Sequence, residues 1–122
     1  MDIELENKLF SKYPTLFPGG RNVDPNKSLI FFGIECGNGW YNLIDELMSK
    51  ILELDKGCIV VQVKQKFGGL RVYIEPTNDK PYDLIIEYEA KSYLICEECG
   101  KYGELRNDRS YVKTLCKGCN KQ

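Results

Sequence analysis

Apolar side chains recur at helical spacing in two segments separated by the Pro- and Gly-rich residues 13–25. Residues 2–12 place four apolar side chains roughly one turn apart. Residues 40–52 carry the longest such pattern, which ends near a lysine and a glycine at 56–57. Positions three and four apart share one face of a helix. Both segments are therefore predicted as helices, the second with one apolar side facing the core.

A third segment, residues 82–94, fits two structures. Its apolar residues lie at helical spacing, with Asp79 placed to cap a helix and Pro81 in its first turn. The residues from 84 to 90 also alternate in a way that suits a strand. A helix is the preferred prediction, and the strand remains an alternative.

Two other regions are typical of β-structure. Residues 28–34, SLIFFGI, form a continuous apolar run of strand length and are predicted as a buried strand. Side-chain character alternates over 59–64 and again over 70–74, on either side of Gly68 and Gly69. Because glycine tolerates the positive φ of a two-residue turn, these runs are predicted to form a hairpin.

A turn made by the two glycines would set the pairing across this hairpin. It places Lys66 opposite Arg71 and Lys64 opposite Tyr73 on one face, with Phe67 on the other, core-facing side. Two cations directly across a ladder destabilise it, so this outer face requires solvent, nearby carboxylates or an anionic ligand. A solvated face and an anion site are equally good interpretations.

A glycine-rich connection, ECGNGW at residues 35–40, precedes the long helix. A strand-to-helix turn of this kind directs backbone N–H groups and the positive helix end toward a ligand. The motif is weak alone, because it lacks the P-loop lysine and the complete dinucleotide fingerprint. Its glycines can instead permit a tight turn, with Trp40 as a core anchor. The combined candidate ligand site comprises Gly37, Asn38, Gly39, Trp40, Lys64, Lys66, Gly68, Gly69, Arg71 and Tyr73.

Four cysteines near the end of the chain form the strongest motif. They make two C-x2-C pairs separated by sixteen residues, Cys96 with Cys99 and Cys116 with Cys119. Such spacing is typical of a structural zinc site, in which four thiolates leave no position for water or substrate. Disulfides belong to oxidising compartments, and nothing in the sequence directs export, so one structural Zn²⁺ is expected.

The other two cysteines, Cys36 and Cys58, lie outside this spacing. They are expected to be buried free thiols, with a reactive thiol as the alternative. The chain has no histidine, which removes the commonest general base and the Ser-His and Cys-His nucleophile pairs.

These elements together predict an α+β fold. A small sheet with a β-hairpin packs against one long and one shorter helix and is closed by a C-terminal four-cysteine zinc ribbon. The ribbon is expected to contain a small hairpin made from residues 103–106 and 111–115. The chain is predicted to divide into an α+β domain, residues 1–94, and a zinc-ribbon module, residues 95–122, packed on it.

Charge and hydropathy restrict the environment and the partners. The net charge is −1, without the overall basic field of nonspecific nucleic-acid binders. No apolar run approaches the ~20 residues that span a membrane, and the acidic start lacks a signal-peptide n-region. A cytoplasmic protein is expected. The ribbon is locally basic through residues such as Arg106, Arg109 and Lys113, but interspersed charges favour a metal staple over a nucleic-acid surface.

Three motifs occur in a fixed order along the chain: ECGNGWYNLID at 35–45, QVKQKFGGLRVY at 62–73, and the paired cysteines. In this order they resemble a family of small, uncharacterised phage and prophage proteins, with an ECGDGW-like turn, a KFGGLR-like hairpin and a C-x2-C…C-x2-C/H end. Asn38 stands where the family often has aspartate, and Cys119 where relatives often have histidine, another valid zinc ligand. The resemblance implies origin in a mobile element, where small proteins often interfere with host defences or regulate host machinery.

Three functions remain open. The preferred one is a phage- or prophage-like, non-enzymatic binding protein that sequesters an anionic small molecule such as a nucleotide immune signal, which needs no catalytic base. The alternative is a zinc-ribbon adaptor that binds nucleic acid or a host protein. An enzyme using Glu35, Asp45 or Cys36 comes third, because the sequence does not indicate that these groups converge.

Overall fold

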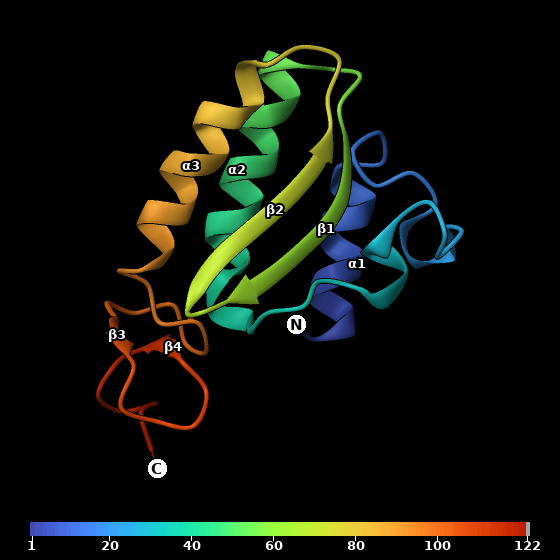
Figure 1. Cartoon of the computed structure of the whole chain (residues 1–122). Coiled ribbons are helices and arrows are strands. Elements are labelled where there is room, and N and C mark those ends of the chain that lie inside the picture. Colours follow the sequence, from blue (N-terminus) through green and yellow to red (C-terminus); the bar gives the residue numbers. More distant parts are fainter. Residues whose placement is uncertain (122) are drawn as a thin grey trace.

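The computed structural model describes residues 1–121 and shows three helices with two small antiparallel sheets (Figure 1). The elements are α1 (Ile3–Lys12), α2 (Tyr41–Leu54), β1 (Ile59–Lys66), β2 (Gly69–Glu75), α3 (Lys80–Ser92), β3 (Glu104–Arg106) and β4 (Lys113–Leu115). Three short 3-10 helices are η1 (Gly20–Asn22), η2 (Leu29–Phe32) and η3 (Asn38–Trp40). The predicted α+β class is confirmed. Within this part of the chain no helix combines the length and the apolar character required to cross a membrane.

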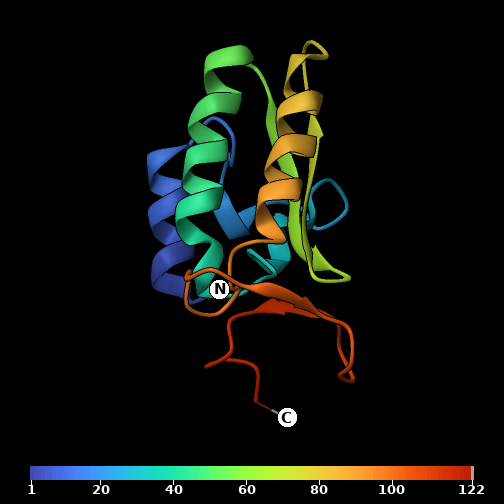
Figure 2. The same cartoon turned by 90° about the vertical axis from the view of Figure 1, so that its left-hand side faces the viewer.

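The hairpin β1–β2 packs its inner face on the helices. Figure 2 shows α2 and α3 side by side, with α1 on the side of α2 opposite α3. Leu47, Met48 and Ile51 of α2 are fully buried in the same core cluster as Val63 and Leu70 from the inner side of the hairpin. Each such side chain contributes about 1.5–3 kcal/mol when it leaves water.

The three predicted helices are confirmed, and the strand alternative for α3 is wrong. Tyr88 is completely buried, whereas Ile86, two residues earlier, is 65% exposed. A strand would place both side chains on one face, but a helix turns them apart. The Tyr88 hydroxyl donates to the Glu46 carboxylate of α2, so tertiary packing selects the helix.

The predicted buried strand at residues 28–34 is wrong. The segment forms η2, whose first turn begins when the Ser28 hydroxyl accepts the Ile30 N–H. Ile30 is buried, but Phe31 and Phe32 are exposed. The segment ends at Gly33, whose φ of 79° turns the chain away from a helix. A continuous apolar run does not encode a period, so the sequence alone could not separate these structures.

The turn of the hairpin differs from the prediction by one residue. Phe67 and Gly68 form it, with φ values of 52° and 85°, so it does not consist of Gly68 and Gly69. Positive φ at both central residues gives the twist that antiparallel strands prefer. The side-chain oxygen of Gln65 accepts the Gly68 N–H at 2.8 Å and holds the turn. Phe67 is 69% exposed and does not face the core.

The pairing across the hairpin shifts accordingly. Lys64 lies opposite Arg71, and Lys66 lies opposite Gly69, so the predicted Lys66–Arg71 and Lys64–Tyr73 pairs are wrong. An irregularity between Val60 and Gln62 lets Val60 and Val63 both face the core although they are three residues apart. Such a bulge breaks the two-residue alternation on which the prediction depended.

Candidate functional site

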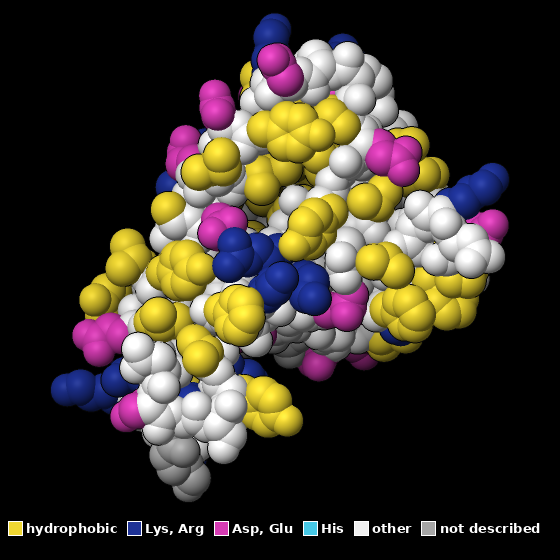
Figure 3. Space-filling model, viewed as in Figure 1, with side chains coloured by type: hydrophobic (Ala, Val, Ile, Leu, Met, Phe, Trp, Pro, Cys, Tyr) yellow, Lys and Arg dark blue, Asp and Glu magenta, His cyan; other side chains and the backbone are white. Residues whose placement is uncertain are grey.

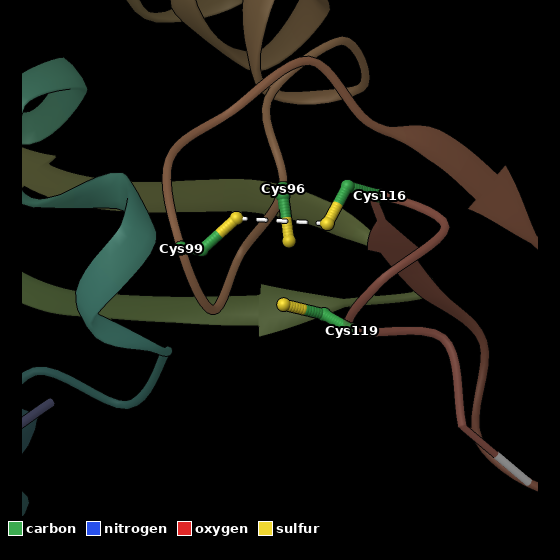
Figure 4. Close-up of side chains that lie close together, drawn as sticks. All are labelled: Cys96, Cys99, Cys116 and Cys119. Atoms are coloured by element: carbon green, nitrogen blue, oxygen red, sulfur yellow. Dashed lines mark hydrogen bonds between the residues drawn. The ribbon is translucent and has the colours of Figure 1, made fainter.

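The four cysteine side chains of the two C-x2-C pairs point toward one another (Figure 4). Their sulfur atoms all lie within 4.8 Å of one another, and Cys99 Sγ is 3.6 Å from Cys116 Sγ. Metal–sulfur bonds of about 2.3 Å in a tetrahedron would separate the sulfurs by about 3.8 Å. The cluster therefore fits a four-thiolate metal site.

Two knuckles and the β3–β4 hairpin build this cluster. The Gly100 N–H donates to Cys96 O at 2.9 Å, and Gly100 has a φ of 83° that closes the first knuckle. The Asn120 N–H donates to Cys116 O at 3.0 Å in the second. The backbone N–H of Cys119, followed by the neighbouring thiols, lowers the pKa of Cys116 to about 7. The thiolate is the form that binds metals.

The glycine turn before α2 is occupied by the first knuckle. The Gly37 N–H donates to the Glu97 carboxylate at 2.9 Å, and the Gly39 N–H donates to Glu97 O at 2.7 Å. The Trp40 indole N–H donates to Ile95 O at 2.8 Å. These donors, which the sequence suggested for an external anion, are engaged with groups of the same chain.

The glycines are required for this close approach. A Cβ on Gly39 would lie 2.2 Å from Cys96 O, and one on Gly37 would lie 2.4 Å from Glu97 O. The side chain of Asn38 accepts the backbone N–H of Asp2 at 2.8 Å, so it ties the turn to the start of α1.

The glycines at the tip of the hairpin meet the same module. The Thr114 hydroxyl of β4 donates to Gly68 O at 2.7 Å, and a Cβ on Gly68 would lie 2.4 Å from Leu105 of β3. A Cβ on Gly69 would lie 2.4 Å from the Tyr93 hydroxyl. Both glycine motifs thus contact the cysteine module, residues 95–121, which lies beyond the turn of the hairpin in Figures 1 and 2.

The sequence reasoning did not single out Glu97, although this residue connects the cysteine cluster to the glycine turn. Glu97 is 4% exposed, and burial raises the pKa of its carboxyl group, while the bond from Gly37 lowers it. Glutamate is almost never fully buried unless it is paired. Only the tertiary structure shows that this one turns inward.

The remaining predicted ligand residues, Lys64, Lys66, Arg71 and Tyr73, share one surface with Gln62. These five residues define the outer hairpin face. These residues alternate with the buried ones along the two strands, so they lie on the face of the hairpin opposite the core. Figure 3 shows Lys and Arg side chains gathered at the middle of the visible face, bordered by hydrophobic side chains.

The cations of the outer hairpin face are unequally paired. Arg71 Nη1 lies 2.8 Å from the Glu89 carboxylate of α3. Lys64 and Lys66 make no ion pair within 4.0 Å in the described residues. Glu35, which bridges to Lys64 through the backbone, accepts a hydrogen bond from the Gln62 amide at 3.3 Å. Two lysine ammonium groups therefore remain available to an anion.

The groups considered for catalysis have separate partners. Burial, followed by the charge of Glu97, raises the pKa of Cys36 to about 12, so this thiol is not a nucleophile at neutral pH. Burial likewise raises the pKa of Cys58 to about 11. Asp45 accepts the Tyr13 hydroxyl at 2.6 Å on the α1 side of α2.

Comparison of the chain with family models, with curated proteins and with solved structures finds no match. The functional assignment therefore depends on the geometry of the cysteine cluster and of the outer hairpin face.

Proposed function

We propose that the four thiolates hold one structural zinc ion. Four sulfur ligands in a tetrahedral arrangement suit zinc or iron, and closed sites of this kind stabilise a fold rather than perform chemistry. β3 and β4 are three residues long each and need such a staple. Native mass spectrometry and elemental analysis should find one zinc per chain, and a stoichiometric iron content with visible absorption would contradict this identity.

We further propose that the protein is a non-enzymatic binding protein whose outer hairpin face holds an anionic ligand, with nucleotide phosphates as the preferred class. The observation that carries this proposal is that Lys64 and Lys66 have no ion-pair partners in residues 1–121. They lie on the same face of the hairpin as the exposed ring of Tyr73, which is one pair away from Lys64. Ammonium groups attract phosphate, and aromatic rings stack on bases. The glycine turn is left out of the site because its N–H groups are already engaged.

The backbone conformation at the tip of the hairpin is a second observation in favour of a ligand site on the outer hairpin face. Phe67 is exposed at a positive φ of 52°, a conformation that costs a non-glycine residue about 1–2 kcal/mol. Strain of this kind is often retained where a side chain serves binding. Its ring lies next to Lys66, with the ammonium nitrogen 5.7 Å from the ring centroid.

The biological setting is part of the proposal. If the motifs reflect a phage or prophage origin, binding of a nucleotide without turnover would remove a signal of host defence. Sequestration of that kind requires affinity and abundance and no catalytic group, which agrees with a chain that has no histidine.

Calorimetry with nucleoside diphosphates and pyrophosphate tests the anion site. The double variant Lys64→Gln with Lys66→Gln should weaken binding by about tenfold or more, since each charge-assisted contact contributes about 1.5–3 kcal/mol. The control removes two exposed lysines elsewhere, Lys8→Gln with Lys56→Gln, so that both double variants have the same net charge. Equal affinity of the two double variants would refute the site.

Binding of nucleic acid or a host protein through the ribbon is the second candidate and has less support. Arg106 contacts the Glu104 carboxylate at 3.5 Å and donates to Leu115 O at 3.1 Å. Lys113 lies 3.8 Å from the Glu98 carboxylate. These cations are engaged locally, although Tyr111 is 78% exposed. The adaptor function predicts salt-sensitive binding of an oligonucleotide that depends on Arg109 and Lys113.

A further inference from the structure

A hollow lies beside the outer hairpin face, between the loop that precedes η2 and the end of the hairpin away from its turn. It has a volume of about 320 Å³. This size lies at the lower end of ligand pockets, which measure roughly 300–1,000 Å³. A second hollow of about 400 Å³ shares Lys27, Ser28 and Val61 with it.

The walls of the first hollow combine an aromatic surface with amide groups. Tyr73 supplies a ring that is 44% exposed, and Leu29 and Val61 supply aliphatic contacts. Asn26 and Gln62 bring side-chain amides, of which the Gln62 nitrogen already donates to Glu35. A flat heteroaromatic ring with hydrogen-bonding edges is the ligand fragment that such walls suit.

The hollow is continuous with the basic part of the outer hairpin face. Gln62 pairs with Tyr73, and the next pair on the same face is Lys64 with Arg71. Positions two apart on a strand are separated by about 7 Å, which is comparable to the distance from a base to the first phosphates of a nucleotide. A ligand with a base at Tyr73 therefore places its phosphates at the cations.

We propose that this hollow binds the base of a nucleoside phosphate, stacked on Tyr73 and bordered by Leu29 and Asn26, while Lys64 and, beyond it, Lys66 hold the phosphates. The inference deepens the proposed function and depends on it. It adds a base-binding pocket to a face that charge alone would make a general anion site. The ligand can be a free nucleotide or one unit of a strand, because both present the same chemistry.

The test compares ligands that have a base with ligands that lack one. Calorimetry is carried out with the four common ribonucleoside diphosphates, with pyrophosphate and with a short single-stranded oligonucleotide. At least one diphosphate should bind about tenfold more tightly than pyrophosphate, because base stacking on an aromatic ring contributes about 1–3 kcal/mol. If the oligonucleotide binds more tightly per binding site than every diphosphate, the ligand is one unit of a nucleic-acid strand and not a free nucleotide.

Two pairs of variants locate the base. Tyr73→Ala should remove most of the advantage of the diphosphate over pyrophosphate, whereas Tyr82→Ala, at an exposed tyrosine of α3, should not. Leu29→Ala should weaken the diphosphate severalfold, whereas Phe32→Ala, on the same 3-10 helix but outside the hollow, should not. Circular dichroism and melting curves of all four variants verify folding.

The outcomes separate the two proposals. Equal affinity for diphosphates and pyrophosphate, with neutral Tyr73→Ala and Leu29→Ala variants, would overturn the pocket and leave the anion site intact. Base-dependent binding that ignores the Lys64→Gln and Lys66→Gln changes would overturn the proposed anion site and keep the hollow. Absence of binding by every ligand at millimolar concentration would overturn both.

Discussion

Single residues at the contact between the cysteine module and the rest of the protein tolerate little change in side-chain size. Gly39 has no space for a side chain, because a Cβ would overlap backbone atoms of Cys96, Glu97 and Gly100. Backbone atoms cannot move aside as flexible side chains do. Glu97 completes the contact by accepting the Gly37 N–H inside the protein.

Gly39→Ala should therefore destabilise the protein by about 1–3 kcal/mol, the range for overpacked sites. Urea unfolding followed by circular dichroism measures the change. Gly118→Ala is the matched control in the second knuckle, where the nearest atom to an added Cβ, Cys116 Sγ, is 3.9 Å away. A neutral Gly39→Ala variant would show that the first knuckle is not tightly seated.

Asp55, directly after α2, binds the loop that precedes α3, and the stability that this contact gives depends on pH. The Thr77 hydroxyl and the backbone N–H groups of Thr77, Gly57 and Asn78 donate to its carboxylate. These bonds, the Thr77 hydroxyl first, hold the pKa of Asp55 below its ordinary value of 3.8. A depressed folded-state pKa gives stability that is present above the unfolded pKa and is lost as the pH falls through the folded one.

Asp55→Asn should lower the unfolding midpoint at pH 7, and its difference from the parent should narrow as the pH falls below about 4. Urea titrations between pH 7 and pH 3 measure this convergence. Asp79→Asn serves as the control, because Asp79 is exposed and makes no capping bond at the start of α3. A constant difference at every pH would exclude the charge of Asp55 as the cause.

At the scale of elements, the hairpin combines a strained turn with a packed interior. Phe67 holds a positive φ that asparagine and glycine adopt more readily, while Gly68 contacts β3 and β4. The turn is therefore shaped by the contact with the cysteine module as well as by its own residues.

Phe67→Asn should raise the stability of the protein by about 1 kcal/mol, because it relieves backbone strain while little apolar surface is buried by the exposed ring. Thermal unfolding measures the gain, and Phe32→Asn, at an exposed phenylalanine without positive φ, should show none. A gain in stability together with weaker nucleotide binding would indicate that the ring serves the ligand. A loss of stability would contradict the strain argument.

At the scale of the whole molecule, the cysteine module connects the two glycine motifs. Its Glu97 carboxylate accepts a hydrogen bond from the glycine turn, and its Thr114 hydroxyl donates one to the tip of the hairpin. Trp40, the single tryptophan, is fully buried and donates to Ile95 O, one residue before the first cysteine. Its fluorescence therefore reports on this junction.

Removal of the proposed metal ion with a chelator, or Cys119→Ser, should shift Trp40 emission to longer wavelength and lower the melting temperature. The reason is that metal binding contributes roughly 10 kcal/mol to the folding of small zinc modules. Cys58→Ala is the control, because this cysteine lies outside the cluster and should leave the metal content unchanged. Unchanged emission and melting after confirmed metal loss would contradict the coupling.

The sequence by itself determined the features that depend on local spacing. The amphipathic period of α2 and the alternation on both sides of the hairpin follow from which side chains share a face. The grouping of the four cysteines follows from two C-x2-C pairs, since each pair can close on one metal. These features need only neighbours along the chain.

Only the tertiary structure decided the conformation of residues 28–34, the register of the hairpin and the groups that bind the glycine turn. The apolar run at residues 28–34 has no period, so its partly exposed 3-10 helix depends on distant packing. The turn at Phe67 moves every partner by two residues, so that Lys66 lies opposite Gly69, and the bulge at Val60 to Gln62 adds one residue beyond it. Glu97 fills the glycine turn from sixty residues away, and no local pattern encodes a contact at that separation.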